Sequence, residues 1–565
     1  MSNRITLPIF FLLIIATLVS VLYIPFLSNS LVFDDHGLFT SLAIYDAAQT
    51  PLKLQPRAFP YFTLGFIQVL SGSIEANRIF SLCLHFACSC ALFFLLRALL
   101  QQARKTSDLY TPDLEQYSIQ IQILAALGTL FFTIHPIAVY GAAYLAQRTI
   151  LFATLFSLFS LWFYRRSFAE NRTVDVATAA LFYAMAVFSK EHAIMLPLVA
   201  LPLTLLYEGS FRSHFKRISL YLALCLPAAF IVLLATKHIV ASSYEPDVGV
   251  MLAQMHEVSI LDRPWGKWLV SILMQTGFFF DYILYWIAPD VRFLSADMRF
   301  DFVDIWFSWG TFLKAFIFFL SPILAIYFLR KKGFIALFCC GFLYCWLLFL
   351  TELAAVRFQE PFVLYRSYLW APGYLMMLVA LCGRLPTRWL IIAAMPMLVV
   401  CFLLARDRLN SFSDEGSVWK DAARKLSSST IIGSERIFYN RGNAYLTEKK
   451  YAEAIADYSL AIQQNPKFSQ AYYNRGLAFS SLHKHADALA DIEHAILLNN
   501  KDGAMIYTKG FILEEQGCFA AARRAYTASN ALGNWMAKLK LEDLKKSTST
   551  SKELKRDLKM KVCAD

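Results

Sequence analysis

Charge is scarce in this sequence. Only 17% of the 565 residues are charged, 58% are hydrophobic, and the mean hydropathy is +0.48. Soluble domains carry about 25% charged residues, so the composition excludes a wholly soluble protein and favours one with many membrane-spanning helices. The net charge of +12 then fits basic cytoplasmic loops and a basic tail better than a nucleic-acid surface.

A framework of cysteine pairs is also lacking. The eleven cysteines include no CxxC pair, which argues against a zinc or thioredoxin-like site. Nine of them lie in or near apolar stretches, where a free thiol behaves as a small hydrophobic group. Cys518 and Cys563 lie outside those stretches and are candidates for a pair.

A removable leader is not expected. The first apolar run, residues 7–27, follows Arg4, has no A-x-A-like cleavage site and is longer than the apolar core of a usual signal peptide. We therefore expect it to remain as the first membrane span.

Long apolar runs recur through residues 1–405. A helix needs about 20 apolar residues to cross a bilayer. Basic clusters mark cytoplasmic loops. All of these clusters fall on the cytoplasmic side only if the run 268–288, which contains Asp281, does not cross the membrane but lies in the interface or re-enters. This threading puts the N-terminus inside and 28–78, 239–310 and everything after 406 outside. The eleven predicted spans are 7–27, 79–100, 119–137, 148–164, 173–188, 193–208, 218–238, 311–329, 334–351, 368–383 and 389–405.

A repeat organises the C-terminal part. The motif YNRG occurs at 439–442 and 473–476, and YTKG follows at 507–510, each offset by 34 residues. A helix–turn–helix period of 34 residues is typical of tetratricopeptide repeats. We expect three units in 434–535, a linker at 406–433 and a basic tail at 536–565 that starts as a capping helix. The concave face of such a stack would bind a protein partner or act as a rigid spacer.

Two neighbouring acids, Asp34 and Asp35, follow the first span. They could be a solvated loop, a general base and its neighbour, or metal ligands. His36 beside them is interpreted as an ordinary loop residue.

Several cations are predicted on the same outer face. His135-Pro136 ends one apolar run, and Arg148 opens the next, where it could grip a phosphate or snorkel to the interface. Lys190, Glu191 and His192 form either a plain turn or a further cationic site. With Arg57 and Arg366, this set fits an anionic, membrane-embedded substrate.

The order of these motifs resembles the membrane proteins with tetratricopeptide repeats of the TMTC type and their bacterial relatives, which are similar to the protein O-mannosyltransferases of the GT-C superfamily. The matching stretches are Asp34-Asp35, Arg57 with Asn77 and His85, His135-Pro136 with Arg148, Lys190-Glu191 with Leu196-Pro197, and YRSYLWAPG at 365–373. The family motif RPL is replaced here by PRAF.

The resemblance implies an all-α fold: a GT-C-like domain of about eleven transmembrane helices with an extracytoplasmic tetratricopeptide α-solenoid. It implies a glycosyltransferase that moves a monosaccharide from a polyprenyl-phosphate donor to a Ser or Thr hydroxyl of an exported protein, with inversion. Pilin is a candidate acceptor by analogy. No cofactor is required, although a divalent metal is possible. The expected partners are the lipid-linked donor, the acceptor protein and membrane lipids, and not nucleic acid.

Carried onto these motifs, the resemblance gives the catalytic role to Asp34 and Asp35. Asp35 is favoured as the base and Asp34 for positioning the sugar or acceptor, but the two are exchangeable. The residues implied in binding the donor phosphate are Arg57, His135, Arg148, Lys190, Glu191 and Arg366.

Two other functions fit parts of the pattern. A non-catalytic scaffold of a bacterial inner membrane would use the repeats to assemble an envelope complex. A lipid-carrier transporter would be expected to show internal symmetry among its spans. No such symmetry is evident, and the charges gather at one surface.

Overall fold

The structure is a computed structural model that describes residues 3–41, 43–50, 53–107, 114–207, 211–240, 242, 251, 261, 263, 265–300 and 308–548. The chain divides into two compact units, Met1–Val418 (unit 1) and Trp419–Asp565 (unit 2). The described residues are almost entirely helical, with one isolated β-bridge between Met298 and Phe362. An all-α fold is therefore confirmed for the described part of the chain.

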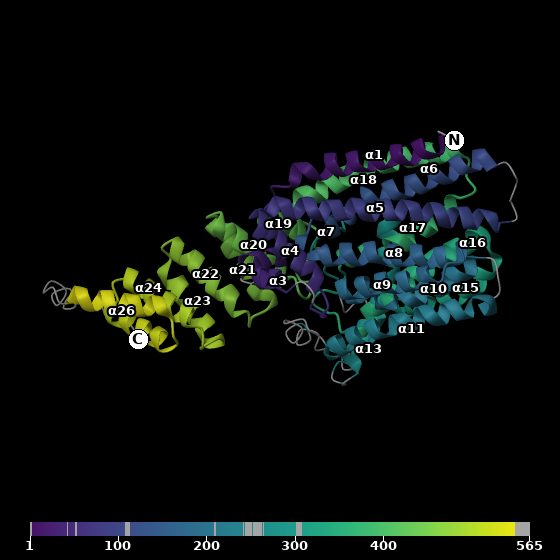
Figure 1. Ribbon diagram of the computed structural model, residues 1–565. Coiled ribbons are helices and arrows are strands. Elements are labelled where there is room, and N and C mark those ends of the chain that lie inside the picture. The colour runs from purple at the N-terminus through teal and green to yellow at the C-terminus, as the bar shows by residue number, and fades with distance from the viewer. Residues whose placement is uncertain are drawn as a thin grey trace. The chain divides into compact units, whose positions relative to one another are not determined.

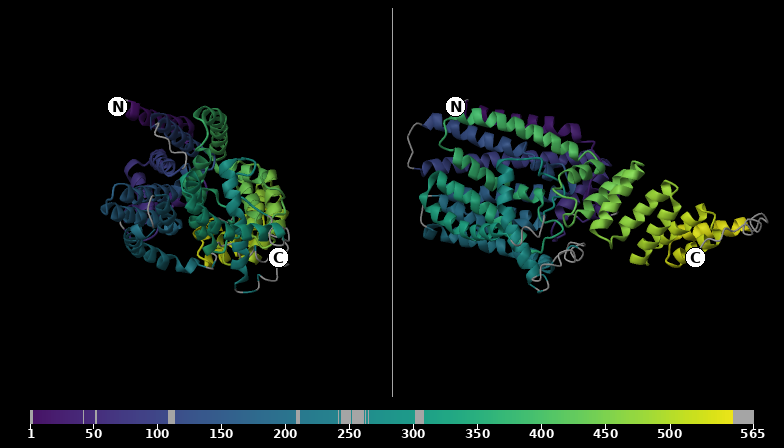
Figure 2. Two further views of the ribbon diagram at one scale, coloured as in Figure 1. Left: turned by 90° about the vertical axis from the view of Figure 1, so that its right-hand side faces the viewer. Right: turned by 180° about the vertical axis from the view of Figure 1, so that it is seen from behind.

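Unit 1 is a bundle of long helices that run side by side (Figures 1 and 2). Shorter helices and 3-10 turns connect them at the ends. The helices are α1 (Asn3–Tyr23), α2 (Asp34–Thr40), α3 (Ala43–Ala48), α4 (Ala58–Ser71), α5 (Ile74–Lys105), α6 (Leu114–Thr133), α7 (Ala138–Ala142), α8 (Arg148–Ala169), α9 (Val174–Ser189), α10 (Leu196–Leu206), α11 (Phe211–Thr236), α13 (Gly266–Ile287), α15 (Trp309–Phe328), α16 (Gly333–Phe349), α17 (Ser367–Cys382) and α18 (Thr387–Ser411).

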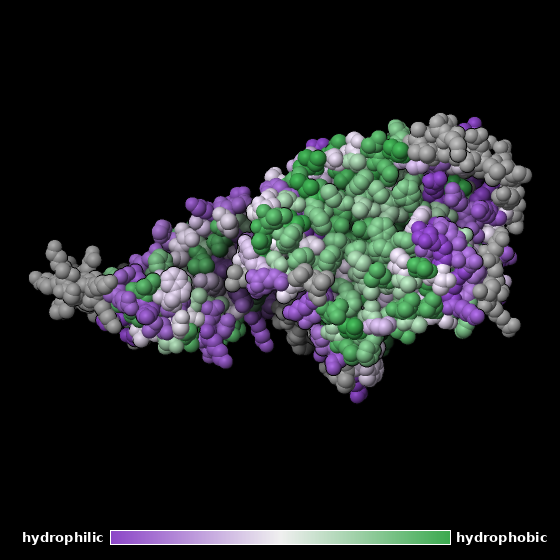
Figure 3. Space-filling view, in the orientation of Figure 1, coloured by the Kyte–Doolittle hydropathy of each residue, from purple (hydrophilic) through white to green (hydrophobic). Residues whose placement is uncertain are grey.

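The outer surface of this bundle is apolar. Large hydrophobic side chains on α15 and α18, such as Phe316 (64% exposed) and Leu403 (59% exposed), face outward, and Figure 3 shows a broad hydrophobic band on unit 1. An apolar surface of this extent is unfavourable in water. Eight helices of the described chain are long and apolar enough to cross a membrane.

The eight long helices reduce the predicted number of eleven spans. Seven of the predicted stretches lie in long helices, whereas the other four form shorter helices at Ser118–Thr133, Val174–Ser189, Glu191–Leu206 and Ser367–Cys382. These helices end where polar residues and proline interrupt the backbone, for example at His135-Pro136. A hydropathy pattern does not show these ends.

The run 268–288 forms one uninterrupted helix, α13, that is itself long enough to cross. One uninterrupted helix does not fit a re-entrant turn, whereas the alternative of a helix in the interface stays a prediction. Its side chains donate hydrogen bonds along the connection between α16 and α17: from Trp268 to the Leu353 carbonyl (2.7 Å), from Gln275 to the Pro361 carbonyl (2.6 Å) and from Trp286 to the Ser367 hydroxyl (3.0 Å). Contacts of this kind agree with a helix fastened to one end of the bundle.

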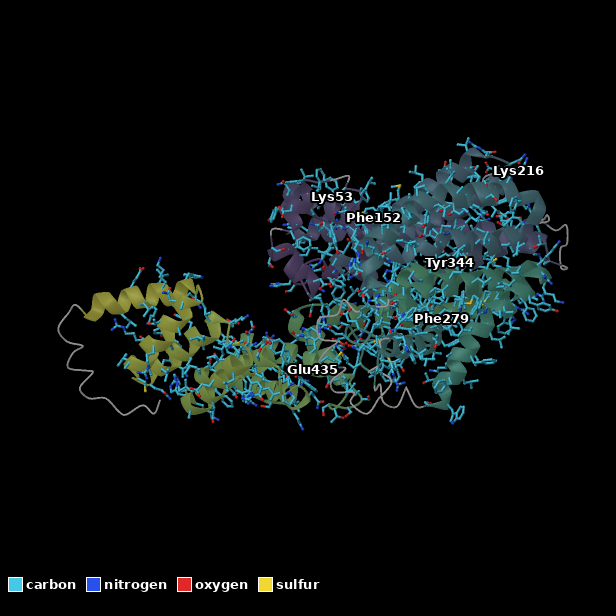
Figure 4. The ribbon with its side chains drawn as sticks, turned by 90° about the horizontal axis from the view of Figure 1, so that it is seen from below. Lys53, Phe152, Lys216, Phe279, Tyr344 and Glu435 are labelled. Atoms are coloured by element: carbon cyan, nitrogen blue, oxygen red, sulfur yellow. The ribbon has the colours of Figure 1, made fainter. Side chains whose placement is uncertain are left out.

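The ends of α1 and α18 lie together. The backbone N–H of Ser30 donates to the Ser413 carbonyl (2.9 Å), and the Asn29 amide donates to the carbonyl of Phe412 (3.1 Å). Residues 29–30 and 412–413 therefore lie at the same end of the bundle. Figure 4 shows Lys53 and Lys216 at opposite ends of unit 1, in agreement with opposite sides of a membrane.

Unit 2 is a stack of helical hairpins (Figure 2). The predicted linker, 406–433, contains the end of α18 and a helix, α19 (Glu415–Arg424), and the predicted tail begins with helix α26. Cys563 lies outside the described residues. The helices of the hairpins and the capping helix are α20 (Glu435–Thr447), α21 (Tyr451–Gln464), α22 (Ser469–Ser481), α23 (His485–Leu498), α24 (Gly503–Glu515), α25 (Phe519–Ala531) and α26 (Trp535–Thr548).

One glycine recurs in the first helix of each hairpin. A Cβ at Gly442 would lie 2.8 Å from the Tyr458 ring, and one at Gly510 would lie 2.7 Å from the Tyr526 ring. At Gly476 the nearest atom is a side-chain carbon of Ile492, at 2.9 Å. Only glycine permits these approaches between paired helices, which explains why the glycine of the 34-residue repeat stays fixed.

Candidate functional site

Asp35 is a structural anchor of the segment after α1. Its side chain is 2% exposed, and its two carboxylate oxygens accept hydrogen bonds from the backbone N–H groups of Leu145 (2.9 Å) and Ala146 (2.6 Å). Burial raises the pKa of Asp35 to about 7, against the lowering effect of these two hydrogen bonds. The carboxylate thus holds α2 to the turn before α8.

Asp34 differs from its neighbour in exposure. It lies at the start of α2 and is exposed, and its backbone N–H donates to the Tyr144 hydroxyl (3.1 Å). A carboxylate must be reachable to take a proton from a substrate, so Asp34 is the acid of the pair that a substrate can contact. His36 is also exposed on α2.

Arg57 and Glu191 form an ion pair between segments far apart in the sequence. The Arg57 Nε donates to Glu191 Oε2 (3.1 Å), and its Nη2 donates to Oε1. The Arg57 backbone has a left-handed φ of 66° just before α4, and its N–H donates to the Phe188 carbonyl (2.6 Å). The guanidinium, 38% exposed, is therefore fixed beside the end of α9.

Glu352 connects three cationic side chains. It is 1% exposed and accepts a hydrogen bond from Arg366 Nη1 (2.6 Å), with His192 Nε2 3.0 Å and Arg357 Nε 3.7 Å from its carboxylate. His192 was named with Lys190 and Glu191 as a possible cationic site, whereas Glu352 and Arg357 were not singled out from the sequence. An acid at the end of an apolar run often indicates function. Glu352 occupies such a position and could have been named from the sequence on that ground.

Lys190 stands apart from these ion pairs. It is 5% exposed, and no carboxylate oxygen of the described chain lies within 4.0 Å of its ammonium, which sits 5.8 Å from the centre of the Tyr365 ring. Burial, together with the charges of Arg57 and Arg366, lowers the pKa of Lys190 to about 7, against the raising effect of Glu191 and Glu352. A buried cation without an ion-pair partner favours an anionic ligand.

Tyr365 connects this cation to the acid. Its ring lies 5.9 Å from the Arg366 guanidinium and 6.3 Å from the Tyr144 ring, whose hydroxyl contacts Asp34. Burial raises the pKa of Tyr365, and the charges of Arg366, Arg57 and Asp34 all act on it. Lys190 and Arg366 therefore border Tyr365, and Asp34 borders the adjacent Tyr144.

Arg148 does not join this group, contrary to the prediction of a phosphate ligand. It is 0% exposed, and its guanidinium donates to Ser81 Oγ (3.1 Å), to Thr63 Oγ1 (3.4 Å) and to both Asn77 oxygens (2.6 and 2.9 Å). Four of its five N–H groups are thus taken by α4 and α5. Arg148 holds these helices to α8, and its sequence position could not reveal that.

His135 is also unsuited to phosphate binding. Its ring is buried and stacks on Trp286, with centroids 4.3 Å apart, and its Nδ1 accepts a hydrogen bond from the Ile137 N–H (3.2 Å). A ring nitrogen that accepts a hydrogen bond carries no proton, so the imidazole is neutral. His85 is likewise a packing residue, between the Tyr368 hydroxyl (2.7 Å) and the Thr133 carbonyl (3.0 Å).

Within the described ranges, no group of three or more His, Cys, Asp or Glu residues is placed to hold a metal ion. What the cluster offers chemically is one reachable carboxylate, an aromatic wall and several cations. That combination can deprotonate a hydroxyl and stabilise an anionic leaving group.

Known proteins resemble the chain mainly in unit 2. The tetratricopeptide-repeat family matches residues 435–468 and 469–502, and no glycosyltransferase family matches the chain. No curated protein matches it. Among solved structures, the crystal structure of MamA is 20% identical, with 27% of this chain and 86% of that chain covered and a TM-score of 0.21. The crystal structure of the APC/C hetero-tetramer Cut9-Hcn1 is 12% identical, with 90% of this chain and 94% of that chain covered and a TM-score of 0.23. The chain therefore carries C-terminal tetratricopeptide repeats.

Proposed function

We propose that this protein is an inverting glycosyltransferase of the GT-C type. It transfers a monosaccharide from a polyprenyl-phosphate donor to a hydroxyl group of an exported protein, at the outer face of a bacterial cytoplasmic membrane. The observation that carries the proposal is Lys190, a buried cation that has no carboxylate partner among the described residues and lies 5.8 Å from the centre of the Tyr365 ring. The neighbouring ring, Tyr144, contacts the backbone of the exposed Asp34.

The donor phosphate binds between Lys190 and the guanidinium groups of Arg57 and Arg366. A polyprenyl-phosphate sugar is a phosphodiester, and the phosphate gains negative charge as the sugar leaves. Fixed cations at that position stabilise the developing charge. Glu191 and Glu352 hold the two arginines in place through the ion pairs described above.

Asp34 is the general base. It takes the proton of the acceptor hydroxyl as the hydroxyl oxygen forms a bond to the anomeric carbon of the sugar. The bond from that carbon to the phosphate oxygen breaks, and its electron pair leaves with the polyprenyl phosphate. Because the attack comes from the face opposite the phosphate, the anomeric centre is inverted. This assigns the base to Asp34 and leaves Asp35 as the anchor of α2.

The tetratricopeptide repeats recruit the acceptor protein. Tetratricopeptide stacks are solenoids with extended concave surfaces suited to binding proteins.

The experiment is intact-mass analysis of exported proteins from cells with and without the gene, which reports the modification and its acceptor together. Complementation with Asp34→Asn should lower transfer by about 100-fold or more, since general-base catalysis contributes 10² to 10⁴. Asp46→Asn, on exposed α3 of the same segment, is the matched control and should transfer at the wild-type rate.

Two outcomes would contradict the proposal. Wild-type modification by Asp34→Asn at normal expression would remove Asp34 as the base. No mass difference between cells with and without the gene would instead favour a scaffold that uses only its repeats.

A further inference from the structure

Three tyrosines line the path from the acid to the cations. The Tyr144 hydroxyl accepts a hydrogen bond from the Asp34 backbone (3.1 Å), and its ring lies 6.3 Å from that of Tyr365 at an angle of 72°. Tyr365 is only partly buried, and Lys190 and Arg366 lie 5.8 and 5.9 Å from its centroid. Tyr61, one turn into α4, lies near enough to Arg57 and Asp34 for both charges to act on it.

The order of these groups has a chemical consequence. If the phosphate lies at Lys190 and Arg366, and the base is Asp34, the sugar between them must lie over Tyr365. Sugar rings have apolar faces of C–H groups, and an aromatic ring covers such a face while its hydroxyl can still hydrogen-bond. A tyrosine held by two cations and a second tyrosine keeps one orientation without substrate.

We propose that Tyr365 is the platform of a monosaccharide subsite, with Tyr144 as its side wall, and that it recognises the sugar of the donor rather than the lipid phosphate. This inference rests on the proposed function and adds the part of the site that selects the sugar. Tyr365 contacts the sugar directly, and Tyr144 positions the ring.

The test compares two ligands on the purified full-length protein: polyprenyl phosphate without a sugar, and polyprenyl phosphates carrying a hexopyranose or a pentofuranose. We expect wild type to bind one sugar-bearing lipid at least about tenfold more tightly than the sugar-free lipid. Tyr365→Ala should lose that preference and bind sugar-free polyprenyl phosphate within about twofold of wild type. Tyr365→Phe should keep most of the preference because the ring remains.

The outcomes separate the two proposals. Equal weakening of both ligands by Tyr365→Ala would assign Tyr365 to the phosphate site and overturn the subsite, and so would an unchanged preference. Failure of wild type to bind polyprenyl phosphate more tightly than uncharged polyprenol would instead overturn the proposed function. Tyr45→Phe, on α3 and 44% exposed, is the matched control outside the proposed site and should keep the wild-type preference.

Discussion

One buried charge of unit 1, Lys190, has different surroundings from the buried charges of unit 2. In unit 2, Arg475 forms a two-pronged ion pair with Asp491, with both N···O distances 2.7 Å, and Arg441 forms the same pair with Asp457. In unit 1, Lys190 is buried as deeply as these acids but has no such partner among the described residues. A charge whose partner is built into the fold stabilises the fold, whereas one left without a partner is suited to a ligand.

Replacing the unpaired cation should give the largest effect. Lys190→Met keeps the length of the side chain and removes its charge, so we expect transfer to fall by about 100-fold, as for loss of one group that stabilises a transition-state charge. The measurement is glycan transfer in membranes, with the protein level checked. Lys314→Met removes a lysine that is paired with Asp281 (3.7 Å) and should leave transfer unchanged. Near-normal transfer by Lys190→Met would break the comparison.

The pH dependence of donor binding is a second test of the comparison between Lys190 and the paired charges. Because the pKa of Lys190 is lowered to about 7, the free protein loses the ammonium charge between pH 6 and 8. We expect the dissociation constant of the lipid-phosphate donor to rise about tenfold over that range, while the phosphodiester charge stays constant. Lys190→Arg keeps its charge and should flatten the profile.

The same lowered pKa affects stability with a definite sign. The unfolded lysine has a pKa of about 10.4, so between pH 7 and 10 the unfolded state binds more protons than the folded state. The contribution of Lys190 therefore makes the folded protein more stable as pH rises through this range.

For donor binding, an identical pH slope in wild type and Lys190→Arg would contradict the role of Lys190.

The smallest effect on activity is expected from the paired charge. Asp491→Asn leaves Arg475 without its carboxylate, and we expect a loss of about 1–3 kcal/mol of stability in unit 2. Hydrogen exchange in α22 and α23 of the full chain measures this loss, with transfer to a short peptide acceptor as the second readout. Transfer should stay at the wild-type rate, and a loss as large as that of Lys190→Met would show that pairing does not separate the two kinds of charge.

Unit 2 could be predicted in some detail because its contacts repeat. Each hairpin meets the same neighbours, so Gly442, Gly476 and Gly510 face the same crowding and appear in the sequence at a fixed interval. The membrane helices of unit 1 share only their apolar character. Their existence was predictable, but their ends were not, which is why the eleven predicted spans became seven long helices and four shorter ones, with α13 as an eighth long helix.

The candidate site was predictable as a set of residues and not as an arrangement. Asp34, Arg57, Lys190, Glu191 and Arg366 were named from their motifs and belong to the proposed site. Arg148 and His135 belong to motifs of the same kind, yet they are buried among helices, and Glu352 lies in the site without any motif. A sequence motif indicates that a polar residue lies near the membrane, but it does not predict which neighbouring groups form hydrogen bonds with that residue.

By itself, the sequence determined the all-helical character, the apolar surface of unit 1 and the repeat of unit 2. The first two follow from the composition and the long apolar runs, and the third follows from the 34-residue period. Only the tertiary structure decided which polar residues are paired. Asp34 and Asp35 are adjacent in the chain and share a chemistry, but successive residues of a helix point in different directions. One therefore meets the backbone of Leu145 and Ala146, and the other stays exposed beside Tyr144.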